Sequence, residues 1–372
     1  MAIATIIAAD GSAPLPVGTS MLVEGTGAVR GSLTGGCVEG AVVVACEEAL
    51  ETGASAVHRF GYSDSDAFAV GLMCGGTIDV LVQSLPSGLA PRPRGETGSG
   101  ADGVSAMIAR LPGSTPGRLP GIAAVSDSHE AAVAAALTPL VPADVLDTAT
   151  RLTLAMIRRG DTGLLRLAAA QGAGHAQGTG QADGSAAPVE LFVESHRPPA
   201  HLVVCGANAF GQALVAAARP LGHRLTVCDP RPAFADPASF PGAEVVRAWP
   251  HHFLAGAAEA GDIDSRSMVC VLTHDPKVDV PALTLALGLD VAYVGAMGSR
   301  RSDRDRHAAL RDAGVDEDAL ARLHSPIGLG LGAVTPAEVA VSILAETIAV
   351  RERRSHVAPL SGDDAPLHSP GG

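Results

Sequence analysis

The stretch from His201 to Asp229 constrains the fold of this chain more than any other feature. His201–Cys205 is a short apolar run typical of a buried parallel strand, and Leu225–Cys228 is a second one. Between them, Phe210–Leu221 has the spacing of a helix that ends near Gly222. A strand, a helix and a second parallel strand in this order form the unit of doubly wound α/β domains, so we expect such a domain here.

The same alternation continues towards the C-terminus. The sequence predicts further strands and helices at Met268–Thr273, Val291–Val294, Arg304–Ala313, Glu317–Leu323 and Pro336–Arg353. We therefore place a Rossmann-like, doubly wound domain at residues 198–354, after Arg197-Pro198-Pro199. The polar, proline-bearing residues 355–372 are expected to form a disordered tail.

Residues 1–197 have a different pattern. Turn residues separate short apolar runs, which predict strands at Ala2–Ala8, Ser20–Glu24, Val29–Leu33 and Thr77–Val82. After Cys37, apolar residues at helical spacing predict an amphipathic helix that Gly53 closes. We expect an α+β domain, with flexible segments at 86–103, rich in Pro, Gly and Ser, and at 172–188, rich in Gly, Ala and Gln.

This first domain contains a weak internal repeat. Val38–Gly53 resembles Val145–Gly160, and Val80–Ser84 resembles Leu191–Ser195, at an offset of about 110 residues. Asp144 occupies in the second copy the place of Cys37 in the first. We expect the two halves to complete one α+β domain, with the glycine-rich cysteine turn present only in the first half.

Composition narrows the class of partner. A net charge of −13 argues against nucleic acid or an anionic membrane as the main partner, because those surfaces attract basic patches. Six cysteines without paired spacing, and no secretory leader at Met1, indicate reduced thiols in the cytoplasm. No apolar run reaches the length of about 18 residues that a membrane span needs.

Two thiols stand beside flexible glycines, Cys37 after Gly35-Gly36 and Cys74 before Gly75-Gly76. Because Cys37 precedes a predicted helix, unpaired amides and the helix dipole are expected to lower its pKa and to attract an anion. Thiolates also suit soft metal centres. The alternative is that both cysteines are small residues in tight turns. A zinc site is not predicted, because there is no C-x-x-C pair.

Gly206, Asn208 and Gly211, with Asp229 eighteen residues further on, form a nearly complete dinucleotide fingerprint. Asn208 stands where the second glycine admits the pyrophosphate, so its side chain is expected to point away or to clash. The pattern is compatible with NAD(P) contact and equally with a purely structural turn. In the first case Arg231 can pair with a ribose phosphate.

Two polar clusters follow other predicted strands, where ligands gather in open α/β sheets. His274, with Asp275 or Asp279, can relay a proton or hold a metal; alternatively His274 caps the strand end and the aspartates begin the next helix. Arg300 and Arg301, after a glycine turn, can grip a phosphate or can simply begin a solvated helix.

Together these motifs resemble the XdhC and CoxI family. The matching segments are Gly35-Gly36-Cys37-Val38-Glu39, Cys74-Gly75-Gly76, Asp229-Pro230-Arg231, Thr273-His274-Asp275-Pro276-Lys277 and Gly298-Ser299-Arg300-Arg301. The resemblance implies an accessory factor that binds the molybdenum cofactor (molybdopterin) and holds it while a cysteine desulfurase replaces an oxo ligand by sulfido. It also implies delivery to an apo molybdenum hydroxylase resembling xanthine dehydrogenase, by a maturation chaperone rather than an enzyme.

The residues then expected to bind cofactor are Gly35, Gly36, Cys37, Glu39, Cys74, Gly75, Gly76, Gly206, Asn208, Gly211, Asp229, Arg231, His274, Asp275, Lys277, Ser299, Arg300 and Arg301. Cys37 is the first choice for the molybdenum contact, because Cys74 precedes a strand. Asn208 departs from the family pattern, as does Gly330, where many relatives carry aspartate.

Two other functions remain open at this stage. One is an NAD(P)-dependent oxidoreductase with His274 as acid–base catalyst, and the other is a scaffold that contacts the hydroxylase without touching cofactor. A homodimer is expected on general grounds, since many soluble proteins form symmetric pairs.

Overall fold

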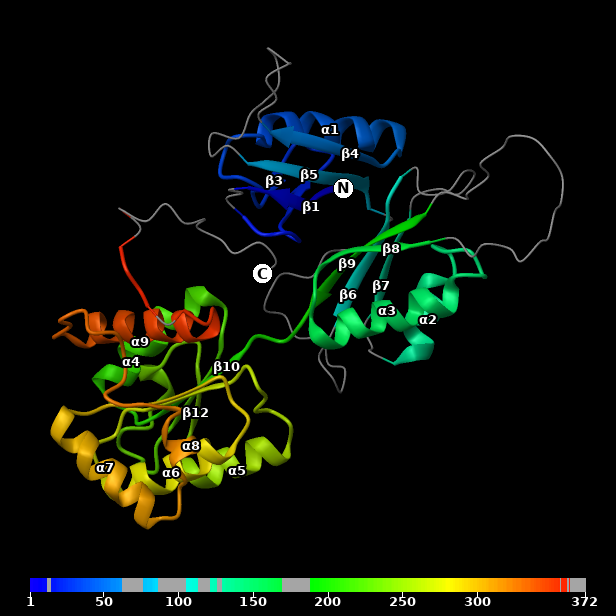
Figure 1. The fold of residues 1–372 in the computed structure, drawn as a ribbon. Helices are drawn as coiled ribbons and strands as arrows, with labels where there is room; N and C mark the ends of the chain where they lie inside the picture. The colour runs from blue at the N-terminus through cyan, green and yellow to red at the C-terminus, as the bar shows by residue number, and fades with distance from the viewer. Residues whose placement is uncertain are drawn as a thin grey trace. The chain divides into compact units, whose positions relative to one another are not determined.

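The computed structural model describes residues 1–11, 15–61, 76–85, 105–112, 121–125, 129–168, 188–354, 356–359 and 361. The chain divides into two compact units, Met1–Pro198 and Pro199–Gly362, called here the N-terminal and the C-terminal unit (Figure 1). The expected flexible segment 86–103 lies outside the described residues, as do nearly all of 172–188 and most of the expected tail from 355.

The N-terminal unit begins with an antiparallel sheet and one helix. Its elements are β1 (Ala2–Asp10), β2 (Ser20–Val23), β3 (Val29–Arg30), α1 (Glu39–Thr52), β4 (Ala56–Gly61) and β5 (Thr77–Ser84), with strand order β3-β2-β1-β5-β4. These confirm the strands and the helix predicted from the sequence. Gly53 ends α1 in the left-handed conformation, at φ 68°, as its position after the apolar pattern predicts.

A second sheet follows in the same unit. Its elements are β6 (Ser105–Arg110), β7 (Ile122–Val125), α2 (Glu130–Leu137), α3 (Leu146–Arg159), β8 (Gly163–Leu167) and β9 (Val189–His196), with strand order β7-β6-β9-β8. This order repeats β2-β1-β5-β4 of the first sheet, and Gly160 ends α3 as Gly53 ends α1. The expected internal repeat is confirmed, and each copy forms a sheet of its own.

Strands of both sheets bury side chains on both faces. In β5, Ile78 and Val80 contact the core beneath α1, whereas Leu81 points to the other side. There it joins Ile7 and Phe192 in a small apolar cluster shared by the two sheets. Alternation with a period of two therefore gives each sheet a helix-covered face and a face against the other sheet.

The C-terminal unit is a six-stranded parallel sheet with order β12-β11-β10-β13-β14-β15, the 3-2-1-4-5-6 order of Rossmann folds. Its strands are β10 (His201–Cys205), β11 (Arg224–Cys228), β12 (Glu244–Val246), β13 (Met268–Val271), β14 (Tyr293–Ala296) and β15 (Leu323–His324). The predicted doubly wound domain is thereby confirmed.

Helices cover both faces of this sheet (Figure 1). One face carries α4 (Ala209–Ala218) and α9 (Pro336–Arg351), and the other carries α5 (Pro250–Glu259), α6 (Pro276–Gly288), α7 (Arg300–Asp312) and α8 (Glu317–Leu320). Helix α7 begins four residues before the predicted Arg304, because Ser299 and Ser302 form a capping box. Among the described residues, no helix combines the length and apolar character needed to cross a membrane.

Candidate functional site

The cysteine turn, residues Gly31–Glu39, leads from β3 into α1. Gly31, Gly35 and Gly36 have φ of 88°, 79° and 122°, a region that side chains other than glycine rarely adopt. A Cβ added to Gly35 or Gly36 would meet nothing within 4 Å, so conformation rather than crowding requires glycine here. Consecutive amides consequently point inward and form an anion-binding concavity.

The Glu39 carboxylate fills this concavity. It accepts hydrogen bonds at 2.8–3.2 Å from the amides of Leu33, Thr34, Gly35, Gly36 and Val38. The hydroxyls of Ser32 and Thr34 add bonds of 2.6 and 2.8 Å. Burial raises the pKa of Glu39, but these hydrogen bonds outweigh burial and hold the pKa far below its ordinary value.

For the amides of residues 33–38 the expectation of unpaired groups is therefore wrong, whereas no side chain caps α1 itself, which begins at Glu39. The Cys37 amide is paired as well, since it donates to the Thr34 hydroxyl at 3.1 Å. Glu39 supplies the negative charge that the helix N-terminus favours, so a ligand phosphate would have to displace it. What the turn offers a ligand is the Cys37 side chain and bare glycine backbone.

Cys37 differs from the other described cysteines in exposure. It is partly exposed, whereas Cys46, Cys205, Cys228 and Cys270 are buried. Burial raises the pKa of Cys46 to about 11 and that of Cys228 to about 12, so these thiols stay protonated at neutral pH. Within the described part of the chain, Cys37 is thus the thiol that a ligand can reach.

The second motif of the N-terminal unit lies directly before β5. Gly61, which ends β4, pairs with Thr77, and Gly76 directly precedes Thr77. Cys74 and Gly75 lie outside the described residues.

The remaining predicted site residues follow the carboxyl ends of the parallel strands in the C-terminal unit. Gly206 has φ 121°, and a Cβ there would lie 2.8 Å from the Thr273 side chain. A Cβ on Gly211 would lie 2.6 Å from the Gly206 carbonyl oxygen. Both glycines therefore let α4 start close against the sheet, as the fingerprint requires. Asn208 caps α4 with its side chain, so of the two expected alternatives, pointing away or clashing with a pyrophosphate, the structure favours the second.

Asp229 is fully buried at the end of β11. It accepts hydrogen bonds from the Ala207 amide at 2.8 Å and from the Arg231 guanidinium at 2.8 and 2.9 Å. Burial raises the pKa of Asp229, but the bonds from Arg231 and Ala207 prevail and lower it below its ordinary value. The Arg231 guanidinium also lies 4.3 Å from the ring centre of Phe234, so its internal contacts orient it.

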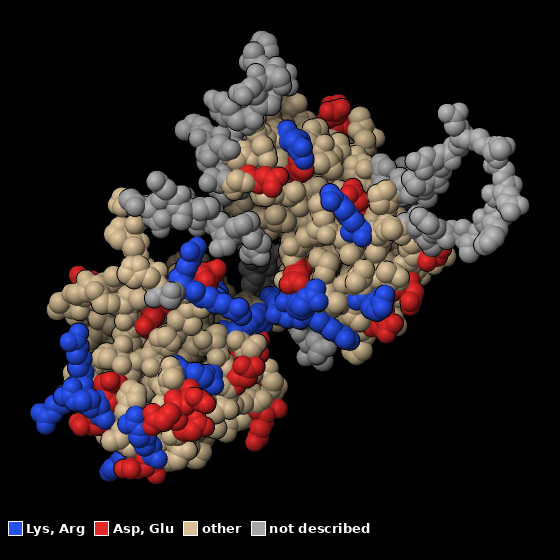
Figure 2. All heavy atoms as spheres, in the orientation of Figure 1, with Lys and Arg blue, Asp and Glu red and all other residues tan. Residues whose placement is uncertain are grey.

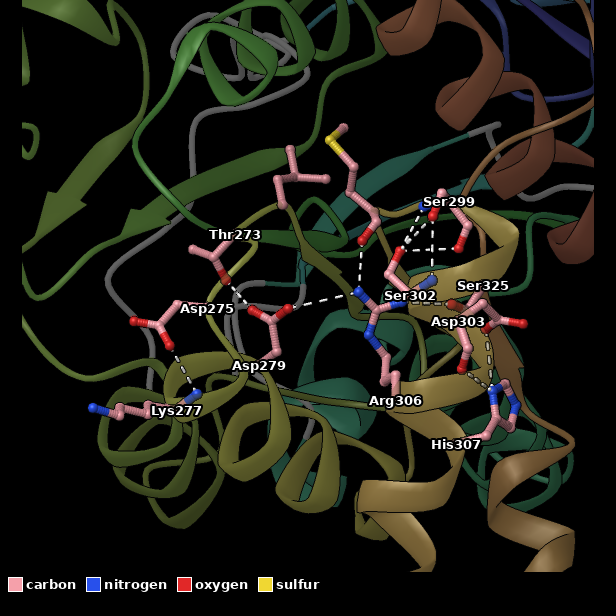
Figure 3. Close-up of polar contacts among 12 residues, drawn as sticks. Thr273, Asp275, Lys277, Asp279, Ser299, Ser302, Asp303, Arg306, His307 and Ser325 are labelled. Atoms are coloured by element: carbon pink, nitrogen blue, oxygen red, sulfur yellow. Dashed lines mark hydrogen bonds and ion pairs between the residues drawn. The ribbon is translucent and has the colours of Figure 1, made fainter.

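The polar residues after β13, Thr273 to Asp279, stabilise the start of α6 (Figure 3). Asp275 caps this helix by accepting from the Lys277 amide at 3.0 Å, and buried Asp279 accepts from the Thr273 hydroxyl. His274 is exposed. Among the described residues, no group of three His, Cys, Asp or Glu side chains is arranged to hold a metal ion. The interpretation of the aspartates as the start of a helix is confirmed.

Arg306 was not predicted as a site residue, yet it organises this edge of the sheet (Figure 3). It is 8% exposed and donates to the Met297 carbonyl at 2.6 Å and to the Ser325 hydroxyl at 2.7 Å. Its guanidinium lies 3.6 Å from Asp279, whose pKa burial raises. Arg306 thereby ties the loops after β14 and β15 to α6. The sequence did not indicate this role, because Arg306 stands among alternating Arg and Asp residues, a pattern typical of an exposed helix surface.

Arg300 and Arg301 occupy the first turn of α7, after the capping residue Ser299, and both are exposed. Neither makes an ion pair within residues 188–354, all of which the structure describes, whereas Arg311 further along the helix pairs with Glu317 at 2.6 Å. Acidic and basic side chains are interspersed over the face of the C-terminal unit drawn in Figure 2. Arg300 and Arg301 therefore remain available to an anionic ligand.

Two sequence models of a known protein family match the segments that contain these motifs. The sequence model of the XdhC and CoxI family matches residues 1–61, and that of the XdhC Rossmann domain matches residues 202–347, together more than half of the chain. The chain belongs to the XdhC and CoxI family. The cysteine turn falls within the first matched segment, and the strand-end clusters fall within the second.

Three known proteins are similar to this chain in sequence. YqeB of Escherichia coli (strain K12) is 34% identical over 164 residues, which are 44% of this chain and 29% of YqeB. A probable xanthine dehydrogenase subunit from Bacillus subtilis (strain 168) is 26% identical over 164 residues, 44% of this chain and 46% of that protein. The molybdenum cofactor insertion chaperone PaoD of Escherichia coli is 24% identical over 348 residues, 93% and 82% of the two chains.

The chain thus matches less than half the length of the first two relatives. A crystal structure from Bacillus halodurans, described as a xanthine dehydrogenase, superposes with a TM-score of 0.58 at 21% identity, over 96% of this chain and 94% of that one. At this identity the likeness supports the fold alone.

Proposed function

We propose that this protein binds the molybdenum cofactor, holds it for sulfuration by a cysteine desulfurase and inserts it into an apo molybdenum hydroxylase of the xanthine dehydrogenase type. The observation that carries the proposal is the cysteine turn, which offers one reachable thiol beside glycine backbone in a chain of the XdhC and CoxI family. The similarity to PaoD, named as an insertion chaperone, supports the same role.

The residues present suit such a cargo. A thiolate is a soft ligand, which matches a molybdenum centre that carries oxo and sulfido ligands. Cys37 is the proposed contact, because the buried cysteines cannot reach a bound molecule. Cys74 shares the motif but lies outside the described residues.

The cargo also carries a phosphate. Because Glu39 fills the amide concavity of the cysteine turn, we do not propose that concavity as the phosphate site. In the C-terminal unit, considered by itself, Arg300 and Arg301 are exposed and without ion pairs in the fully described range 188–354, and paired guanidinium groups bind phosphate well. We propose them as an anion site of that unit.

Anaerobic loading tests the proposal directly. The full chain is incubated with free molybdenum cofactor and desalted, and the retained molybdenum and the fluorescence of the oxidised pterin are measured. We expect stoichiometric retention by the native protein and a loss of at least about tenfold in Cys37→Ser, since one tenfold step corresponds to about 1.4 kcal/mol of contact energy.

The matched control is Cys46→Ala, which changes a buried cysteine of α1, the helix that follows the cysteine turn, and is expected to retain the cargo. Full retention by Cys37→Ser would show that the thiol is not the contact. Absence of retention by the native protein would refute cofactor binding altogether and favour the scaffold hypothesis.

A further inference from the structure

In the Rossmann turn after β10, a side chain fills the position where dinucleotide-binding domains have a glycine and leave room for the ligand. In those domains the second glycine of the fingerprint admits the pyrophosphate, and free amides at the helix N-terminus bind it. In this chain the corresponding residue is Asn208, with extended backbone dihedrals, φ −139° and ψ −177°. Its conformation therefore does not require glycine, and its side chain decides what the turn can bind.

The Asn208 side chain fills the space where a pyrophosphate would lie, and it also accepts the hydrogen bonds that a pyrophosphate would accept. Its Oδ1 accepts hydrogen bonds from the amides of Phe210 and Gly211, both at 3.0 Å. Its Nδ2 donates to the Leu272 carbonyl at 2.8 Å, across the point where the strand order reverses between β10 and β13. A pyrophosphate would have to remove the cap and leave the Leu272 carbonyl without this partner.

The other amides of the turn are also paired. Gly206 donates to the Cys228 carbonyl at 2.9 Å, and Asn208 donates to the Gly206 carbonyl at 3.2 Å. The Ala207 amide donates to Asp229 at 2.8 Å. Five of the six amides from Gly206 to Gly211 thus donate to atoms of the protein itself.

The acidic residue of the fingerprint, Asp229, is likewise hydrogen-bonded within the protein. In dinucleotide-binding domains it accepts hydrogen bonds from the ribose hydroxyls. Here Asp229 has no exposed surface, and both of its oxygens accept from Arg231. An incoming ribose would compete with a bidentate ion pair that also fixes the turn through Ala207.

We infer that Asn208 is a specificity-determining residue that closes the dinucleotide site, and that this Rossmann domain does not bind NAD(P). The residues present do not fit the cofactor that the fold suggests. An oxidoreductase that uses this turn is therefore disfavoured, and the domain serves as scaffold for its strand-end loops. The inference does not depend on the molybdenum proposal, because it concerns a different turn and a different ligand.

Titration of the full chain with NADH, followed by nucleotide fluorescence and by displacement with NADPH, tests the inference. We expect the native protein to bind with a Kd above about 1 mM. Asn208→Gly frees two amides and the space above them, so its Kd should fall at least about tenfold. Asn208→Asp keeps the cap and adds negative charge, and is expected to bind no better than the native protein.

Circular dichroism verifies that the variants are folded, and Asn208→Ala makes the same comparison should the glycine variant fail to fold. A native Kd below about 1 mM would overturn the inference, and so would a folded Asn208→Gly without the tenfold gain.

Discussion

Replacement of Glu39 by glutamine tests whether its carboxylate shapes the cysteine turn. Glutamine has the same shape, but one of its two terminal groups is an NH₂ that cannot accept a hydrogen bond. If this group replaces Oε2, the amides of Gly36 and Val38 lose their acceptor, at 2.8 and 3.2 Å in the native turn. The Thr34 hydroxyl, which also donates to Oε2, can rotate away.

The expected cost follows from these two amides. A buried donor without a partner costs about 1–3 kcal/mol. Gly36 is exposed, so water replaces part of its bond, and the buried Val38 amide keeps a second, 3.3 Å contact with the Thr34 hydroxyl. We therefore expect the turn to lose about 2 kcal/mol of stability against local opening, near the middle of that range.

Hydrogen exchange measures this loss locally. In the regime where exchange follows the opening equilibrium, about 2 kcal/mol corresponds to roughly 30-fold faster exchange of the amides at residues 33–38. Peptide-resolved mass spectrometry of the full chain compares the native protein with Glu39→Gln. Glu48→Gln, on the exposed side of the same helix, is the matched control and should change nothing. Exchange within about threefold of native in Glu39→Gln would refute the reasoning.

The pH dependence supplies a second check on the same variant. Because the folded-state pKa of Glu39 lies below its ordinary value near about 4.3, the stabilisation is complete above that pH and is lost as the pH falls towards the folded pKa. The ratio of exchange rates between variant and native protein should stay constant above about pH 5 and shrink only in acid. A ratio that falls between neutral pH and about pH 5 contradicts the assigned hydrogen bonds.

Two further substitutions test the C-terminal unit, with urea unfolding followed by the single tryptophan. Arg306→Ala leaves the buried Asp279 carboxylate unpaired and should cost about 3–5 kcal/mol, whereas Arg304→Ala, on the exposed surface of α7, should cost less than about 0.5 kcal/mol. Equal effects would contradict the organising role. Gly211→Ala places a methyl group 2.6 Å from a carbonyl oxygen and should cost about 1–3 kcal/mol, whereas Gly256→Ala, with nothing within 4 Å in α5, should stabilise by about 0.5–1 kcal/mol. A neutral Gly211→Ala would show that α4 can move away from the sheet.

The features that depend on residue spacing were predictable from the sequence. Strand β10 has the predicted bounds, because a fully buried parallel strand is apolar on both faces. The internal repeat was visible because Val38–Gly53 and Val145–Gly160 preserve both the helix pattern and the closing glycine. The doubly wound class of the C-terminal unit follows from the alternation of strands and helices, whereas the order of its strands does not.

The direction of individual polar side chains was not predictable in this way. Asn208 was expected either to point away or to clash with a pyrophosphate, and only the extended backbone before a helix, which directs its amide onto the first free N–H groups, decides between these alternatives. The internal contacts of Glu39 were not predicted, because they arise from the positive φ of Gly35 and Gly36, which turns five amides towards its carboxylate. Such contacts depend on backbone dihedrals that residue spacing does not report.

The internal contacts of Glu39 and Asn208 bear on recognition in the same way. A glycine-rich turn before a helix is a common anion site, and this chain has one in each unit, yet each is filled by a side chain of the protein: Glu39 in the first and Asn208 in the second. A bound phosphate would therefore compete with contacts that hold the backbone in place. We propose instead that each unit offers exposed side chains to a ligand, a thiol at Cys37 in the N-terminal unit and guanidinium groups at Arg300 and Arg301 in the C-terminal unit. Single substitutions at these positions would test recognition while the two turns keep their shape.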